Sequence, residues 1–307
     1  MIRFTEHTSI DKKKWDACIE ASSEGNIFVC SFYLDAVCEN WSALILGDYE
    51  AVFPLAAGSK YRIQYLYQPF FTRYFGVYSK KRPSGKLLSD FFAAIPEKFK
   101  YIEFCLHEEQ SVEAAGFEPK ERKFQLLGLN EAHPSLQKSY SDNARRSIKK
   151  ALKAGAKVKE EIKGKEVVEL FRRTKGQELE VFKPEDYKRL LRLMEACEQR
   201  GVAETIGIYS AEGELAAAGF FMRYGNRYVF LKSGVTDEGK SHGFMHLLFD
   251  TFIQKHAESD TILDFGGSSV ESVARFYKNF GAKDCVYLQV QKNRLPRLVN
   301  WLKSLKK

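Results

Sequence analysis

Hydrophobic and polar positions follow one order of patterns through the first half of the chain. Apolar or alternating runs, broken by the turn signals Gly47-Asp48 and Gly58-Ser59, predict an antiparallel β meander, because alternation with period two suits half-buried strands. A helix and two further strands are predicted after it. The predicted elements are strands 41–46, 51–56 and 61–67, a helix opening at 83–85, and strands 101–106 and 123–129.

The second half repeats this order. Turns at Glu212-Gly213 and Gly225-Asn226 separate the strands of a second meander, and a helix, a strand, a helix and a final strand follow it. The predicted elements are strands 205–209, 215–223 and 227–233, helix 240–256, strand 261–265, helix 269–280 and strand 285–291. Because an internal repeat outranks single motifs, we interpret the chain as two copies of one α+β unit.

Composition limits the class of protein. With 307 residues, 44% of them hydrophobic, the chain can bury the core of one large domain or two ordinary ones. Six scattered cysteines without a C-x-x-C pair predict neither a zinc site nor a disulfide framework, and no signal peptide or membrane span is expected, so a cytoplasmic protein is predicted. The net charge of +8 favours anionic partners: a CoA-like donor, a nucleotide-linked substrate, RNA or an acidic membrane.

One stretch combines a strand, a glycine turn and a helix. The apolar run 261–265 closes with Gly266-Gly267, and Ser268 with Glu271 forms a capping box for the helix that follows. Gly281 stands where a left-handed residue ends a helix. One apolar face of this helix is formed by Val270, Val273, Ala274 and Tyr277.

The same stretch carries a family resemblance. Residues 264–267 (DFGG), 276–278 (FYK) and 280–281 (FG) resemble the DFGG…F.K..FG signature of Fem-type peptidyltransferases and their FemAB-like acetyltransferase relatives. Residues 274–281 are also similar to the A..fY...G helix of GNAT-fold N-acyltransferases. The resemblance implies an α+β fold of two tandem GNAT-like domains, each a mostly antiparallel mixed sheet flanked by helices. Their expected bounds are 1–134 and 135–307.

Residues 234–241 (GVTDEGKS) match the P-loop pattern G-x-x-x-x-G-K-[ST] between a predicted strand and a predicted helix. In a nucleotidase Lys240 would reach the terminal phosphates and Ser241 would hold magnesium. However, the preceding strand belongs to an antiparallel meander, and Asp237 and Glu238 lie where anions would approach. A P-loop NTPase is therefore the least favoured function.

The rival interpretation of this segment is the CoA pyrophosphate loop of GNAT enzymes, in which backbone N–H groups at a helix N-terminus bind the pyrophosphate. Residues 240–245 resemble the [QR]-x-x-G-x-[GA] pattern, but Lys240 replaces Gln or Arg, and Met245 replaces a small residue and could crowd the pyrophosphate. The resemblance implies a set of cofactor-binding residues: Val235, Lys240, Ser241, His242, Gly243 and Phe244. His242 and His246 lack further ligands nearby, so no metal is expected.

Acyl transfer needs a proton for the leaving group and donors for the oxyanion. The resemblance makes Tyr277 the candidate catalytic acid, although its ring could equally fill the core. Lys278 matches the lysine of the Fem signature and could hold an anionic substrate or be simply exposed. Backbone N–H groups on residues 215–223 are the expected oxyanion donors. No base stands out, although Glu178 and Glu180 are available.

An acceptor-binding surface is a further expectation. The aromatic-rich segment 65–78 predicts core packing first and a groove wall second, and residues 68–71 (QPFF) resemble a stretch near the acceptor in the first Fem domain. The Fem signature adds the DFGG residues to this surface. The expected substrate-binding residues are Gln68, Arg73, Tyr74, Asp264, Gly266 and Gly267.

Two segments concentrate basic residues. The helix predicted within 134–159 has an apolar stripe and a basic outer face, which suits a solvated linker or a contact to polyphosphate or RNA. Its basic residues are Arg145, Arg146, Lys149, Lys150 and Lys153. The tail 295–307 reads as a basic amphipathic helix that docks on the fold or contacts an anionic membrane.

The sequence therefore predicts an N-acyltransferase that moves an acyl group from acyl-CoA, acetyl-CoA in the first place, to an amine of a sugar, a peptide or a cell-envelope precursor. The alternative enzyme is a Fem-type peptidyltransferase that uses aminoacyl-tRNA and acts on a peptidoglycan precursor. The alternative that is not an enzyme is a GNAT-fold binding protein without catalytic activity. In that case Met245 would block the pyrophosphate loop. Binding to DNA is not expected.

Overall fold

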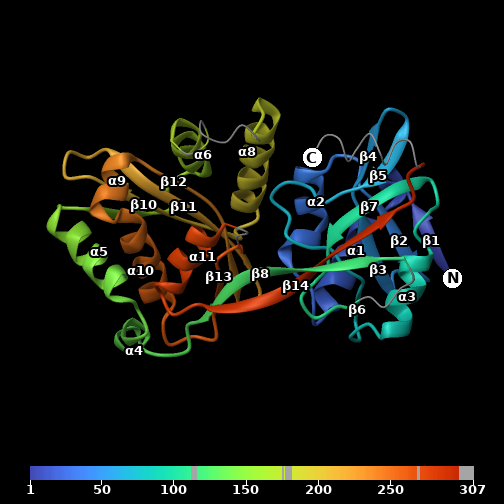
Figure 1. The fold of residues 1–307 in the computed structure, drawn as a ribbon, viewed down its shortest axis with the longest axis horizontal. Coiled ribbons are helices and arrows are strands. Elements are labelled where there is room, and N and C mark those ends of the chain that lie inside the picture. The colour runs from blue at the N-terminus through green and yellow to red at the C-terminus, as the bar shows by residue number, and fades with distance from the viewer. Residues whose placement is uncertain (112–115, 175, 177–181, 268–269, 297–307) are drawn as a thin grey trace. The chain divides into compact units, whose positions relative to one another are not determined.

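The computed structural model describes residues 1–111, 116–174, 176, 182–267 and 270–296, and Figure 1 shows its fold. Contacts within the chain divide it into two compact units. Unit 1 comprises Met1–Arg122 and Val286–Lys307, and unit 2 comprises Lys123–Cys285. Each unit combines β-sheet with helices, so the predicted α+β class is confirmed.

Unit 1 contains two groups of paired strands. An antiparallel sheet has the order β1 (Ile2–Thr5), β2 (Ser42–Leu46), β3 (Ala51–Leu55) and β6 (Tyr78–Ser79). A second group has the order β4 (Ala57–Lys60), β5 (Ile63–Leu66), β7 (Phe99–Cys105) and β14 (Lys283–Asn293). The helices of unit 1 are η1 (His7–Ser9), α1 (Lys12–Ala21), η2 (Ile27–Val29), α2 (Ser31–Val37) and α3 (Gly85–Ala93).

Local sequence explains how the first helix of unit 1 forms. Asp11 caps α1 by accepting hydrogen bonds from the N–H groups of Lys13 and Lys14. The buried face of α1 carries Trp15, whose ring lies edge-on to Trp41 with centroids 4.7 Å apart. Aromatic residues of this kind fill the core of unit 1.

Unit 2 contains one group of paired strands in the order β8 (Glu118–Gly128), β13 (Ile262–Asp264), β12 (Arg227–Val235), β11 (Leu215–Tyr224), β10 (Ala203–Tyr209) and β9 (Lys157–Glu160). Its helices are α4 (His133–Lys138), α5 (Asp142–Lys153), α6 (Gly164–Arg173), α8 (Pro184–Gln199), α9 (Asp237–His242), α10 (Phe244–His256) and α11 (Glu271–Lys278). Strands β12 and β13 are parallel, and the other pairs are antiparallel.

The core of unit 2 lies between its sheet and the helices α5, α10 and α11. The rings of Phe221 on β11 and Phe252 on α10 stack with centroids 4.2 Å apart. The predicted basic helix α5 buries Ala144, Ile148 and Ala151 of its predicted apolar stripe against this core, whereas Leu152, the fourth member, is exposed.

The two units share a topology, which confirms the predicted tandem GNAT-like architecture. In unit 1, β5 pairs with β7 in parallel, just as β12 pairs with β13 in unit 2. The last strands are exchanged: β14, from the second repeat, pairs with β7, whereas β8, from the first repeat, pairs with β13. The compact units therefore divide inside β8 and β14, and the boundary at 134/135 stays a prediction about the sequence repeats.

Several predicted elements differ in extent. The helix predicted at 240–256 is two helices, because Gly243 adopts the left-handed conformation (φ 77°) between α9 and α10. The helix predicted at 269–280 begins at Glu271 with Val270 as its N-cap, and Ser268 of the expected capping box lies outside the described residues. The tail from 297 onward also lies outside them. Within the described chain, no helix is long and apolar enough to cross a membrane.

Candidate functional site

The parallel strands of unit 2 separate at the middle of β12. Strands β12 and β13 pair at Arg227–Ile262, Tyr228–Leu263 and Val229–Asp264, where β13 ends, while β12 continues to Val235. Within the described chain, the second half of β12 therefore has only β11 beside it. No described strand takes the place of β13 beside this half of β12.

A β-bulge lies where the strands separate. Phe221 of β11 pairs with Phe230, and the preceding Phe220 pairs with Lys232, so Leu231 is an extra residue on β12. Bulges leave a residue unpaired in the ladder and are common beside active sites. The backbone N–H groups of residues 215–223, the expected oxyanion donors, lie on β11. This strand pairs with β10 on one side and with β12 on the other, so these groups are used in the sheet.

The corresponding opening in unit 1 is closed by the chain itself. Strands β5 and β7 pair up to Leu66–Ile102, and Phe75 then rejoins the sheet as a parallel bridge to Leu106. The Phe75 N–H donates to the Cys105 carbonyl at 2.7 Å. The Gln68 side-chain carbonyl accepts a hydrogen bond from the Cys105 N–H at 2.8 Å. In unit 1, the chain thus forms hydrogen bonds to the strand edge that corresponds to the open edge in unit 2.

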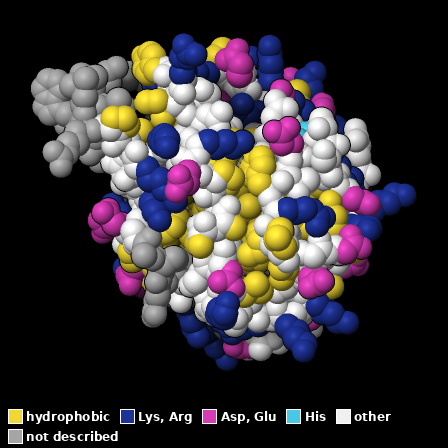
Figure 2. All heavy atoms as spheres, turned by 90° about the vertical axis from the view of Figure 1, so that its right-hand side faces the viewer, with side chains coloured by type: hydrophobic (Ala, Val, Ile, Leu, Met, Phe, Trp, Pro, Cys, Tyr) yellow, Lys and Arg dark blue, Asp and Glu magenta, His cyan; other side chains and the backbone are white. Residues whose placement is uncertain are grey.

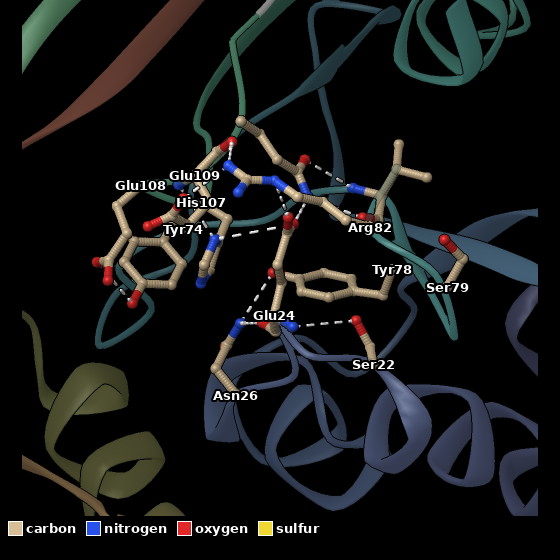
Figure 3. A network of polar contacts seen from close by, with 12 residues as sticks. Ser22, Glu24, Asn26, Tyr74, Tyr78, Ser79, Arg82, His107, Glu108 and Glu109 are labelled. Carbon is tan, nitrogen blue, oxygen red and sulfur yellow. Dashed lines mark hydrogen bonds and ion pairs between the residues drawn. The ribbon is translucent and has the colours of Figure 1, made fainter. Parts of the chain in front are cut away.

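A buried polar network lies beside this closed opening (Figure 3). The Glu24 side chain is only 5% exposed and accepts a hydrogen bond from Gln110 Nε2 at 2.6 Å. His107 Nδ1 lies 3.9 Å from one Glu24 oxygen, and Arg82 Nε lies 3.4 Å from the other. Burial raises the pKa of Glu24, an effect that the Gln110 hydrogen bond and the Arg82 charge partly offset. The network fixes three chain segments of unit 1 together.

The predicted catalytic residues point in different directions. Tyr277 is buried among aromatic rings, 4.8 Å from Phe265 and 6.4 Å from Phe230 between centroids, so its ring lies beside the residue at which β12 leaves β13. Lys278 is half-exposed and forms an ion pair with Asp284 at 2.6 Å. The structure therefore brings Tyr277 to the opening and directs Lys278 to a neighbouring acid.

Asp264 and the glycine turn after it form one rigid feature. The fully buried Asp264 carboxylate binds the Arg227 guanidinium at 2.7 Å and accepts a hydrogen bond from the Gly266 N–H at 3.0 Å. Gly267 has a φ of 68°, and a Cβ placed there would lie 2.9 Å from the Cβ of Phe124. These residues hold the end of β13 in place, so the structure supports a positioning role for them.

The residues expected to bind the CoA pyrophosphate lie on α9 and at its junction with α10. Lys240 is paired with Asp237 at 2.9 Å. A Cβ at Gly243 would lie 2.8 Å from the Ser147 carbonyl oxygen, so this glycine serves helix packing. The remaining members differ in exposure: Phe244 is buried, Ser241 is exposed, and Val235 and His242 are intermediate.

A cavity of about 540 Å³ opens beside the N-terminus of α9. It is lined by Arg173, Thr174, Glu214, Leu215, Ala216, Thr236, Asp237, Glu238 and Lys240. Three carboxylates share this cavity with two cations, which is a poor electrostatic match for a pyrophosphate. The charges of this cavity therefore give little support to the expected pyrophosphate loop.

The glycines of the P-loop pattern are packing residues. A Cβ at Gly234 would lie 2.5 Å from the Phe171 backbone nitrogen, and one at Gly239 would lie 2.5 Å from the Ala216 carbonyl oxygen. The segment between them ends β12 and begins α9, capped by Thr236. This geometry gives no phosphate cradle.

The expected acceptor residues of unit 1 are part of its interior. The Arg73 guanidinium lies 5.6 Å from the ring centroids of both Phe28 and Tyr74, and it is buried. The Tyr74 hydroxyl lies 3.4 Å from the Glu108 carboxylate. The Gln68 side chain accepts the hydrogen bond from Cys105 that closes the opening in unit 1. Core packing, the first of the two expectations for this segment, accounts for these contacts.

Sequence reasoning did not predict the contacts of two side chains of unit 2. Lys232, on the open part of β12, lies 4.0 Å from the ring centroid of Phe171 and 4.6 Å from that of Phe182. His246 packs 4.8 Å from the ring of Phe276, and burial lowers its pKa to about 4, so it is neutral at pH 7. No local pattern signals either contact. Among the described residues, no group of three metal-ligating side chains comes together.

Fold and site together define a class: a tandem GNAT fold in which the second unit has the open, bulged strand. Sequence comparison agrees, since residues 138–279 match the family model of an acetyltransferase (GNAT) domain. Residues 138–279 are thus similar to GNAT acetyltransferase domains, in keeping with the tandem GNAT-like fold. A search of curated protein sequences returned no match.

Solved structures confirm the two-unit fold and the FemAB-like resemblance. The structure of FemX is similar with a TM-score of 0.63 and 14% identity, over 91% of this chain and 96% of that one. L-PGS from Bacillus licheniformis gives 0.57 and 12%, over 95% of each chain. A tandem GNAT protein from the clavulanic acid biosynthesis pathway gives 0.55 and 12%, over 96% of this chain and 99% of that one.

Proposed function

We propose that this protein is an N-acyltransferase whose acyl donor binds along the open edge of β12 in unit 2 and whose acceptor is a primary amine. The observation that carries the proposal is the separation of β12 from β13 at a bulge, beside Tyr277. The pantetheine arm of an acyl-CoA donor is extended and contains amide groups, so it can occupy the place of the missing strand. Its amides would pair with backbone groups on the open side of β12.

The proposed reaction uses groups of unit 2. The neutral amine nitrogen attacks the acyl carbonyl carbon, and the developing oxyanion accepts hydrogen bonds from N–H groups of the bulge near Leu231. When the bond from the carbonyl carbon to the leaving sulfur or oxygen breaks, the Tyr277 hydroxyl donates a proton to that atom. The proton released by the amine returns to the phenolate, directly or through water, so the enzyme is regenerated.

Acyl-CoA, acetyl-CoA in the first place, is the first candidate donor. The GNAT family match and the open edge of β12 support it. Arg173 and Lys240, the two cations that line the cavity beside α9, are the proposed partners of its phosphates. Lys278, Val235 and the α9 residues remain proposed contacts for the donor or for an anionic acceptor, such as a cell-envelope precursor.

Aminoacyl-tRNA is the second candidate donor. The specific observation in its favour is the acidic lining of the 540 Å³ cavity by Glu214, Asp237 and Glu238, which suits the ammonium of an aminoacyl group better than a pyrophosphate. The similarity to FemX and the basic outer face of α5 are in keeping with it. On this proposal the acceptor would be a peptidoglycan precursor or a lipid.

The test is a thermal-shift titration of the full chain with acetyl-CoA, CoA and aminoacyl-tRNA. A ligand that binds only the folded state adds about 2.7 kcal/mol of stability at about a hundred times its dissociation constant. If a pyrophosphate lies at α9, Glu238→Gln should increase the acetyl-CoA shift and Lys240→Ala should reduce it. A shift with aminoacyl-tRNA alone would select the second donor. Failure of every donor to bind would defeat the proposed function in favour of a silent binding protein.

A further inference from the structure

Unit 1 contains an unpaired sheet edge that its counterpart in unit 2 lacks. In unit 2, residues of β11 pair with β10 on one side and with β12 on the other. In unit 1 the corresponding strand is interrupted at Ala56: β3 pairs with β2 and β6, whereas β4 pairs with β5. Within the described chain, β4 is therefore the edge strand of its sheet, with nothing paired to its outer side.

The geometry of the β4–β5 hairpin shows which groups face outward. Its two turn residues, Tyr61 and Arg62, have φ values of 52° and 63°, as a two-residue type I′ turn requires. In such a hairpin the closing pair, Lys60–Ile63, exchanges backbone hydrogen bonds, and hydrogen-bonded pairs then alternate with open ones. The Tyr67 N–H donates to the Ala56 carbonyl, which fits this alternation.

It follows that Ala57 and Ser59 direct their N–H and C=O groups away from β5. Each is opposite its partner, Leu66 or Gln64, at a position where the ladder makes no hydrogen bond. No hydrogen bond joins these outward groups to another described residue. The edge thus offers two donors and two acceptors at the spacing of a β-strand.

A cavity of about 390 Å³ lies against this edge. Three consecutive residues of β4, Ala57 to Ser59, line it, so the strand edge rather than one face of the strand borders the cavity. The opposite wall comes from the end of β1, the η1 turn and the start of β2. The remaining lining residues are Phe4, Glu6, His7, Thr8, Asn40, Ser42, Gln64, Lys98 and Phe99.

Two side chains of this cavity are held in place for binding an anion. Lys98 Nζ lies 4.3 Å from the ring centroid of Phe4 and 5.3 Å from that of Phe99. His7 Nε2 lies 2.9 Å from Asp35, which also accepts hydrogen bonds from Lys12 and Trp41. The His7 imidazole is therefore held by the Asp35 carboxylate, which Lys12 and Trp41 also hold in place.

Charge on the hairpin favours an acidic occupant. Lys60 and Arg62 are exposed at the tip of the hairpin, and Glu6 is the acid among the cavity residues. Figure 2 shows the side of the molecule toward the N-terminal strand, where apolar side chains gather and lysine and arginine side chains flank them.

We propose that the outer edge of β4 and the adjoining cavity bind an extended acidic peptide segment, which adds to β4 as a strand and places a carboxylate near Lys98 and His7. The backbone of the peptide pairs with Ala57 and Ser59, and this pairing is independent of peptide sequence. The cavity supplies the preference for an acidic side chain. The site goes beyond the proposed acyl transfer and does not depend on it.

The test measures binding of a fluorescent peptide of alternating glutamate and valine to the full chain. Ser59→Pro removes an outward N–H while leaving the β4–β5 ladder intact, and should weaken binding about tenfold. Ser59→Ala retains the N–H and should bind as the parent does. Lys98→Gln should weaken binding, whereas Lys86→Gln, an exposed lysine on α3, should not.

Peptide variants keep the test independent of protein folding. N-methylation of alternate peptide residues should abolish binding in one register, and a lysine–valine peptide should bind at least about tenfold more weakly. Absence of acidic-peptide binding, or equal binding of the N-methylated and parent peptides, would overturn the proposal. Dimerisation of the chain that Ser59→Pro abolishes would assign the edge to a second copy and overturn it as well.

Discussion

The two units differ at the point where their two parallel strands separate. In unit 1, β5 and β7 separate after Leu66 and are rejoined at Phe75, so the chain fills its own opening. In unit 2, β12 and β13 separate after Val229, and no described residue fills the gap. Because unpaired backbone groups are costly when buried, a strand edge kept open beside an aromatic core indicates a place for a ligand. The two units thus have corresponding openings, and in unit 1 the chain closes its own.

The largest expected effect concerns the buried ion pair that fixes the end of β13. Asp264→Asn leaves the Arg227 guanidinium without its counter-charge in a site where Asp264 is fully buried. We expect the free energy of unfolding to fall by about 3–5 kcal/mol in chemical denaturation. Asp284→Asn, which breaks the half-exposed pair with Lys278, is the matched control and should cost less than about 1 kcal/mol. Equal losses would show that the β13 anchor has no special role.

The next effect concerns catalysis in unit 2. Tyr277→Phe retains the packed ring and removes the hydroxyl, so the fold should persist while kcat falls about 10²-fold, or about 2.7 kcal/mol in the barrier. Tyr228→Phe on the paired part of β12 and Tyr74→Phe in unit 1 should leave kcat unchanged. Steady-state kinetics with the donor identified by titration measures all three. An unchanged kcat for Tyr277→Phe would leave the tyrosine with a packing role only.

A smaller effect is the pH dependence of stability, to which unit 1 and unit 2 contribute with opposite signs. His246 has a pKa lowered by burial from 6.5 to about 4, so the unfolded state binds protons first and stability is lost as pH falls from about 6.5 toward 4, by up to about 3 kcal/mol. Glu24 has a raised pKa, so its folded form takes up a proton first and gains stability as pH falls toward 4.5. His246→Leu should flatten the acid loss, and Glu24→Gln should steepen it. Denaturation curves across this range would contradict the assignment if either variant kept the parent slope.

The smallest effect tests the closure of unit 1. Gln68→Ala removes the acceptor of the Cys105 N–H and should lower the free energy of unfolding by about 1 kcal/mol. Amide exchange at Cys105 should accelerate as well. Gln64→Ala, at an exposed position on β5, provides the control and should change neither quantity. Unchanged exchange at Cys105 would show that the side chain does not seal the opening.

The sequence predicted the repeat because hydrophobic periodicity and glycine turns are local signals. The order of strands and helices, the turn at Gly266 and the buried stripe of α5 all follow from such patterns. The helix break at Gly243 was missed, because a left-handed glycine in a helical pattern is visible only when the contact with Ser147 is known.

Contacts between distant segments explain the other differences. The Glu24–Gln110 hydrogen bond, for example, joins residues 86 positions apart. The bulge at Leu231 depends on the register between two strands, which one sequence does not encode locally. For the site, the sequence placed Tyr277 on the correct helix, but the open edge of β12 required the structure.

Hydrogen–deuterium exchange of the full chain, with and without the donor selected by thermal shift, tests the central claim most directly. The account predicts that donor binding protects backbone amides of β12 from Phe230 to Val235. It also predicts no change at Cys105 to His107, where unit 1 is closed by its own chain. Protection in unit 1 with none on β12 would contradict it.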